Sequence, residues 1–143
     1  MEQDAELEQK LEAVHEAGQG VFAHLLDLPV KYITINKPAR CRLTLPGQLI
    51  TFIFKDLGCV FYTAGTDVQK YYYPHELPIS EVDQPWINFM GGWLPSRKLK
   101  TEAYLRKQLA DPKIRGQIEK LSGELLKRST LSGTEIKAIL ETP

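Results

Sequence analysis

Five consecutive residues have the types and spacing of a zinc-binding motif with one substitution. They are His15, Glu16, Ala17, Gly18 and Gln19, and they match HExxH except that an amide stands at the fifth position. In HExxH two imidazoles on one helix face bind Zn²⁺, while the glutamate polarises the metal-bound water. His15 and Gln19 are therefore candidate metal ligands, and Glu16 is the candidate catalytic base. Because zinc prefers imidazole, thiolate or carboxylate, an amide at Gln19 should weaken binding by orders of magnitude.

The chain has two further histidines that could replace the missing ligand. His24 follows His15 by nine positions, which on a continuous helix is about 180° around the axis, so the two cannot share one ion. His75 lies in an irregular segment that could fold over the helix, and it stays open as a ligand together with carboxylates such as Asp67.

A long amphipathic helix is predicted over residues 5–28 to carry the motif. Asp4 is its expected N-cap and Pro29 ends it. The apolar stripe consists of Leu7, Leu11, Val14, Gly18, Val21, Leu25 and Leu28. Glycine inside a helix costs roughly 0.5–1 kcal/mol relative to alanine, so Gly18 and Gly20 call for a neighbouring segment packed closely against the backbone.

The remaining chain is expected to complete one α+β domain over residues 1–143, mainly helical with a small antiparallel sheet. Four segments rich in β-branched and aromatic residues predict the sheet within 30–64, namely 30–36, 40–45, 48–55 and 58–64. Cys41 and Cys59 fall in these segments and are expected to be thiols rather than a disulfide.

The segment 65–99 is rich in proline and aromatic residues and lacks periodicity, so it is predicted to be an irregular loop. Its tryptophans and tyrosines could form a recognition surface or complete a small core. Residues 100–143 form a helical C-terminal region. Asp111-Pro112 is expected to start one helix there, and Ser132 and Glu135 form a capping box that starts another. The first of these helices has one apolar face of Ile114, Ile118, Leu121 and Leu125.

Two stretches at opposite ends of the chain resemble one known family. AVHEAGQGVFAHLLDLPVKYITI (13–35) resembles the start of the peptidase domain of FtsH-type ATP-dependent zinc metalloproteases, with HEAGQ in place of HEAGH. LLKRSTLSGTEIKAIL (125–140) resembles the C-terminal segment of that domain.

The resemblance implies a metalloprotease-like fold, with His15 at the first zinc-ligand position, Glu16 at the general-base position and Gln19 where the second ligand belongs. The family's third ligand is acidic, and none of the conceivable carboxylates stands in a matching context; these are Asp67, Glu81, Asp83 and Asp111. The interpretation is a degenerate, non-catalytic relative, a pseudoenzyme without zinc that acts by protein binding. The alternative is an active zinc-dependent metalloendopeptidase with a remodelled ligand set.

The charge composition indicates which class of partner to expect. The 143 residues contain 18 basic and 18 acidic residues, so nothing in the bulk charge suggests nucleic acid, and the expected partner is a protein or peptide. Residues 1–16 are acidic and residues 96–128 are basic, which suggests either an acidic partner, self-association or two regions that face each other.

No apolar run reaches the roughly 20 residues of a membrane span, and the acidic start is unlike a signal peptide, so a cytoplasmic location is expected. A phosphate-binding loop for an ATPase motor is also absent from the sequence.

Overall fold

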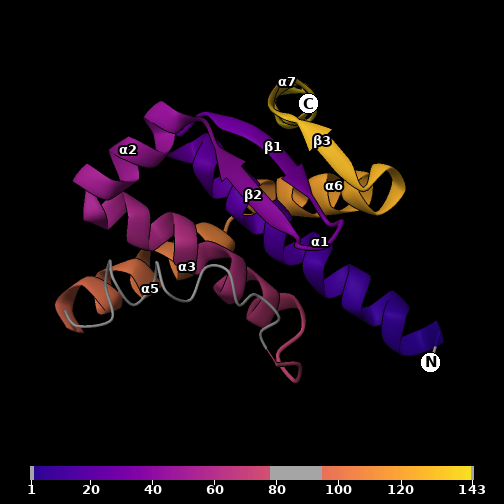
Figure 1. The fold of residues 1–143 in the computed structure, drawn as a ribbon. Helices are drawn as coiled ribbons and strands as arrows, with labels where there is room; N and C mark the ends of the chain where they lie inside the picture. Colours follow the sequence, from indigo (N-terminus) through magenta and orange to yellow (C-terminus); the bar gives the residue numbers. More distant parts are fainter. Residues whose placement is uncertain (1, 78–94, 143) are drawn as a thin grey trace.

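The protein has an α+β fold, mostly helical, with a small three-stranded antiparallel sheet, as the sequence predicts (Figure 1). The structure is a computed structural model and describes residues 2–77 and 95–142. Its helices are α1 (Glu2–Leu25), α2 (Leu45–Ile53), α3 (Lys55–Tyr72), α5 (Pro95–Leu109), α6 (Pro112–Arg128) and α7 (Gly133–Glu141). Its strands are β1 (Val30–Thr34), β2 (Arg40–Leu43) and β3 (Thr130–Ser132).

The first helix lies at the centre of the fold. α1 contacts α3, α6 and β1, and every residue from 11 to 23 is buried, although the sequence pattern predicted a single buried stripe. The predicted helix is confirmed with shifted ends. It begins at Glu2, so Asp4 lies inside the helix and the prediction that it is the N-cap is wrong. After Leu25, Asp27 takes a positive φ of 56° and the chain turns toward β1.

Two glycines of α1 lie where neighbouring elements approach its backbone closely. A Cβ atom at Gly18 would lie 2.8 Å from Cβ of Val68 in α3. A Cβ atom at Gly20 would lie 2.5 Å from Cδ1 of Ile33 in β1 and 3.0 Å from Cδ2 of Leu121 in α6. The close packing expected at these two positions is therefore confirmed.

The sheet has the order β2-β1-β3, with β1 in the middle. Ile33 of β1 lies opposite Cys41 in β2 and Leu131 in β3. The strands predicted within 30–36 and 40–45 are thus confirmed. The third strand comes from the far end of the chain, where the hydroxyls of Thr34 and Thr130 form a hydrogen bond of 2.7 Å.

The strands predicted over 48–55 and 58–64 are wrong, because both segments are helical. Residues 45–53 form α2 and residues 55–72 form α3, so the predicted sheet region 30–64 contains strands only in its first half. The buried positions of α3 form a continuous run from Gly58 to Tyr62 and then recur at helical spacing, at Ala64, Gly65, Val68 and Gln69. Burial against α1 at this period favours a helix over the strand preference of the individual residue types.

The C-terminal helices follow their predicted caps. The Asp111 side chain accepts a hydrogen bond from the Lys113 amide at 2.9 Å, and Ser132 and Glu135 cap α7 reciprocally. The predicted apolar face of α6 is buried, as expected for Ile114, Ile118, Leu121 and Leu125.

The predicted irregular loop over 65–99 is wrong at both ends. Residues 65–72 finish α3, and residues from Pro95 onward begin α5. Residues 78–94, which carry Trp86, Phe89 and Trp93, lie outside the described residues, so their predicted role as surface or core is untested. Within the described tyrosines, Tyr71 is 49% exposed.

Both cysteines are thiols, as predicted. Cys41 is half-buried and Cys59 is buried, and they form no disulfide. Burial raises the pKa of the Cys59 thiol.

Candidate functional site

The motif lies in the middle of α1 and is enclosed by the fold. His15, Glu16 and Gln19 are only 1%, 2% and 1% exposed. The three side chains share a helix that is continuous from Glu2 to Leu25, so the helical spacing assumed for them holds. None of the three faces solvent.

His15 packs against a glycine of α3. A Cβ atom at Gly65 would lie 2.5 Å from Nε2 of His15 and 2.7 Å from both Cδ2 and Cε1. Nearly equal distances to three neighbouring ring atoms place that position over the face of the imidazole, not along the in-plane lone pair of Nε2. Gly65 therefore provides the room in which the ring lies between α1 and α3.

Gln19 uses its amide in the same helix pair. Its Nε2 donates a hydrogen bond to the backbone carbonyl of Phe61 in α3, at 3.4 Å. A buried amide is stabilised by such a bond, since leaving it unsatisfied would cost about 1–3 kcal/mol. The side chain at the second-ligand position thus contributes to helix packing.

A second buried carboxylate lies one helical turn before Glu16. Glu12 is 8% exposed. Burial, together with the negative charge of Glu8, raises the pKa of Glu12, while Lys37 acts in the opposite direction. This face of α1 therefore carries acidic groups into a region of low polarity.

The other proposed ligands do not join His15. His24 is half-buried and lines a surface pocket with residues of β1 and α7, on the far side of α1 as predicted. His75 is exposed in the turn after α3. Asp67 follows Gly65 by two positions, about 200° around α3, and so points away from His15. Asp111 caps α6.

The described residues do not supply a zinc ligand set. Over 2–77 and 95–142 no group of three or more His, Cys, Asp or Glu side chains could hold a metal ion. Glu81 and Asp83 lie outside these ranges. With Gln19 bonded to a carbonyl, the described side chains around His15 do not fit a three-ligand zinc centre.

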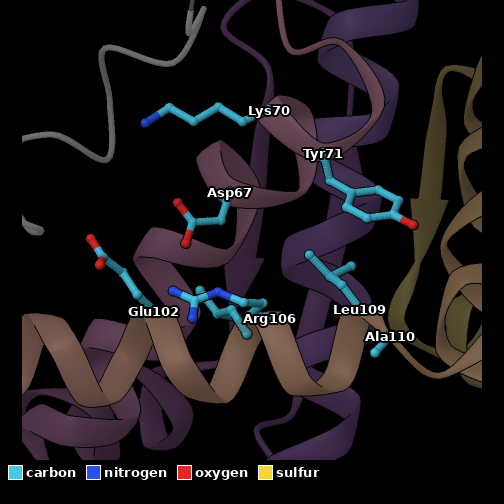
Figure 2. A pocket seen from close by; sticks show the side chains of 8 residues that line it. Asp67, Lys70, Tyr71, Glu102, Arg106, Leu109 and Ala110 are labelled. Carbon is cyan, nitrogen blue, oxygen red and sulfur yellow. The ribbon is translucent and has the colours of Figure 1, made fainter.

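A separate pocket of about 610 Å³ lies between α3 and α5 (Figure 2). Asp67 points from α3 toward α5, where Glu102 and Arg106 extend toward it. Leu105 and Leu109 add apolar surface to its lining. The pocket thus combines charges of both signs with an apolar part.

Asp67 is a partly buried acid of this pocket. Burial raises its pKa, although the positive charge of Lys70 opposes the shift. From the sequence, Asp67 was considered only as a possible zinc ligand, and the pocket was not predicted. The pocket could have been suspected from the helical spacing of Glu102 and Arg106, which places both side chains on one face of α5.

The ion pairs of the described residues do not join the acidic start of the chain to its basic C-terminal helices. Lys37 binds Glu8 at 2.6 Å, next to the β1–β2 turn. Arg128 binds Glu135 at 2.6 Å and Glu124 at 3.2 Å, within the C-terminal region. Because α1 nevertheless packs against α6, the three interpretations of the uneven charge stay open.

Comparison with known proteins gives no family assignment. No family model, no curated protein and no solved structure matches this chain. Among the described helices, no single one is long and apolar enough to cross a membrane. The bent pair α2 and α3, with an angle of 113° between them, meets the length and composition criteria only when the two are taken together.

Proposed function

We propose that this chain is a non-catalytic relative of the FtsH-type peptidase domain that acts in the cytoplasm by binding a protein or peptide. The observation that carries the proposal is the burial of the motif, with His15 and Glu16 at most 2% exposed. A protease base must reach a water and a substrate carbonyl. At its present position Glu16 is enclosed by the protein and reaches neither.

The second support is the role of the substituted residue. Gln19 bonds the Phe61 carbonyl, and Gly65 packs on the His15 ring, so both ligand positions contribute to the α1–α3 interface. The motif then stabilises a helix pair instead of holding a metal ion. This reading agrees with the poor affinity of zinc for an amide ligand.

The pocket between α3 and α5 is the place where we expect a peptide to bind. A peptide presents charges of both signs beside apolar side chains, and Asp67, Arg106 and Leu109 offer complementary groups in one pocket. Polar groups that orient a ligand over an apolar surface are typical of binding sites.

The metal content of the purified protein tests the non-catalytic assignment. We expect only background zinc by elemental analysis, below about 0.1 per chain, and no cleavage of unfolded casein with added zinc. Gln19→His restores the HExxH pattern and is measured beside it. Stoichiometric zinc in the natural chain, with cleavage that Glu16→Gln abolishes, would instead show an active metallopeptidase with a remodelled ligand set.

Selection from a random peptide library tests the binding site. We expect peptides bound by the natural chain to lose affinity about tenfold or more for Arg106→Ala, as for a charged hot-spot contact. Lys107→Ala is the matched control, because Lys107 is the next residue of α5 and does not line the pocket. Equal affinity for both variants, or no selected peptide, would refute this site.

A further inference from the structure

The solvent face of the sheet carries two arginines of β2. Side chains along a strand point alternately to its two faces. Ile33 and Leu131 are fully buried, and Cys41 packs against the core, so these three positions define the inner face of the sheet. Arg40 and Arg42 flank Cys41 and therefore point outward, away from the core.

The strand register places uncharged side chains beside both arginines. Arg42 lies opposite Tyr32 in β1, and Arg40 lies opposite Thr34. β1 lies between β2 and β3, as Figure 1 shows, and the outward residues of β1 and β3 are Tyr32, Thr34, Thr130 and Ser132. Arg42 is exposed and Arg40 is half-buried. Neither arginine thus has a carboxylate opposite it on this face.

The β1–β2 hairpin is basic although the chain as a whole has no net charge. Residues 30–43 contain four basic residues and no acidic one; they are Lys31, Lys37, Arg40 and Arg42. Lys37 binds Glu8 at 2.6 Å. Within 2–77 and 95–142, no ion pair involves either arginine. The outward face of the hairpin therefore carries positive charge that the described part of the fold does not neutralise.

The chemistry of arginine indicates what this face can bind. A guanidinium group forms paired hydrogen bonds with a carboxylate and is weakly hydrated, so it binds acidic groups at interfaces. Arg40 and Arg42 lie two positions apart, roughly 6.6 Å along the strand. Alternate residues of an extended peptide have the same spacing. Two acidic side chains at alternate positions of such a peptide can therefore each meet one arginine.

A short acidic segment fits this face better than a long polyanion. Nucleic-acid binding depends on many phosphate contacts and on a broad basic surface. Here the ion pair of Lys37 with Glu8 brings the acidic start of α1 beside the hairpin turn. That carboxylate would repel a chain of phosphates extending past the two arginines.

We propose that the outward face of the β1–β2 hairpin binds a short, extended acidic segment of a partner protein. Two carboxylates of the segment form hydrogen-bonded ion pairs with Arg40 and Arg42. This face is separate from the motif on α1 and from the pocket between α3 and α5. The proposal does not depend on the function proposed for either of them.

Fluorescence anisotropy with labelled synthetic peptides tests the proposal. We expect the natural chain to bind a peptide of alternating glutamate and serine, and not one of alternating lysine and serine. Adding 0.5 M salt should weaken the binding, because exposed charges are screened.

A pair of double variants tests the site itself. Arg40→Gln/Arg42→Gln should lower the affinity for the glutamate peptide about tenfold, as expected for the loss of charge-assisted hydrogen bonds. Lys107→Gln/Lys113→Gln makes the same change in net charge on α5 and at the start of α6, whereas β3 follows the end of α6. This control should change the affinity less than about twofold. Circular dichroism and thermal unfolding check that both variants are folded.

Three results would overturn the proposal. One is no binding of the glutamate peptide at low salt. A second is an equal loss of affinity in the two double variants, since binding would then depend on bulk charge and not on this face. The third is a single-stranded oligonucleotide that binds more tightly than the peptide and is lost in Arg40→Gln/Arg42→Gln, because the face would then bind nucleic acid.

Discussion

Replacing Gly18 by alanine should destabilise the protein, even though alanine is favoured over glycine inside a helix. The new Cβ would lie 2.8 Å from Cβ of Val68, about 0.7 Å short of the ~3.5 Å at which two carbon atoms rest. Val68 is fully buried, and its Cβ is attached to the α3 backbone, so neither atom can move without separating the two helices. Overpacking of this kind costs about 1–3 kcal/mol.

Gly116 provides the matched control for this substitution. It lies in α6, and a Cβ there would meet nothing within 4 Å, so Gly116→Ala should gain about 1 kcal/mol from helix propensity alone. The same gain applies at Gly18 and offsets part of the clash. The difference between the two variants in the free energy of unfolding, measured by urea denaturation, should therefore be about 1–3 kcal/mol. If Gly18→Ala stabilises the protein as much as Gly116→Ala does, α1 and α3 are not packed this closely.

Four further predictions concern single side chains. Ser132→Ala should cost about 1 kcal/mol in urea denaturation by removing the α7 cap. The pKa of the Glu135 carboxyl is lowered from 4.5 by its hydrogen bonds to Ser132. The charged carboxylate therefore stabilises the fold above pH 4.5, and this stabilisation is lost as the pH falls through the lower pKa of the folded state. In Glu135→Gln the free energy of unfolding, measured by urea denaturation, should decrease less on acidification. The pKa of Tyr72 is raised from 10.0 to about 12, mainly by burial, so its stabilisation is present below pH 10 and is lost as pH rises through about 12. Ultraviolet titration should show a phenol that ionises near pH 12 and is removed by Tyr72→Phe, whereas the burial-raised phenol of Tyr104 remains. Cys41 should react with a thiol reagent well before Cys59, whose thiol is buried and has a raised pKa, and equal rates would contradict this burial.

The elements that the sequence predicted correctly are those with a local cause. Asp111 before Pro112, and Ser132 three residues before Glu135, define helix starts by bonds within one turn of chain. In the helix that carries His15, the apolar residues recur at helical spacing over many turns. This pattern predicts a helix in spite of the low helix propensity of Gly18 and Gly20. Such signals need no knowledge of the rest of the fold.

The segment 45–72 was mispredicted because residue type and period disagreed there. Its β-branched and aromatic residues favour strands, whereas the exposed positions of α2 and the buried positions in the second half of α3 recur at helical spacing. Strand preference depends strongly on context, so a sustained period is the better guide. Pro46, in the first turn of α2 after Thr44, was a helix-start signal within the supposed strands.

The surroundings of the motif could not be predicted, since they depend on contacts between distant segments. Gly65 lies fifty positions after His15, and nothing near the motif indicates that a glycine of α3 covers the imidazole. The third strand could not be predicted for the same reason. Thr130–Ser132 is three residues long and pairs with β1 almost a hundred positions earlier.

Burial also determines where a ligand can act on this molecule. For His15 to meet a metal ion or a substrate, α3 would have to move away from α1, and that motion would break the contact at Gly18 and the hydrogen bond from Gln19 to Phe61. A buried interface held by backbone-level contact opens rarely, because each lost contact adds to the free energy of local unfolding. The outward face of the β1–β2 hairpin and the α3–α5 pocket need no such opening. Binding at these surfaces is therefore possible in the folded state as it stands, whereas chemistry at the motif requires a different arrangement of the two helices.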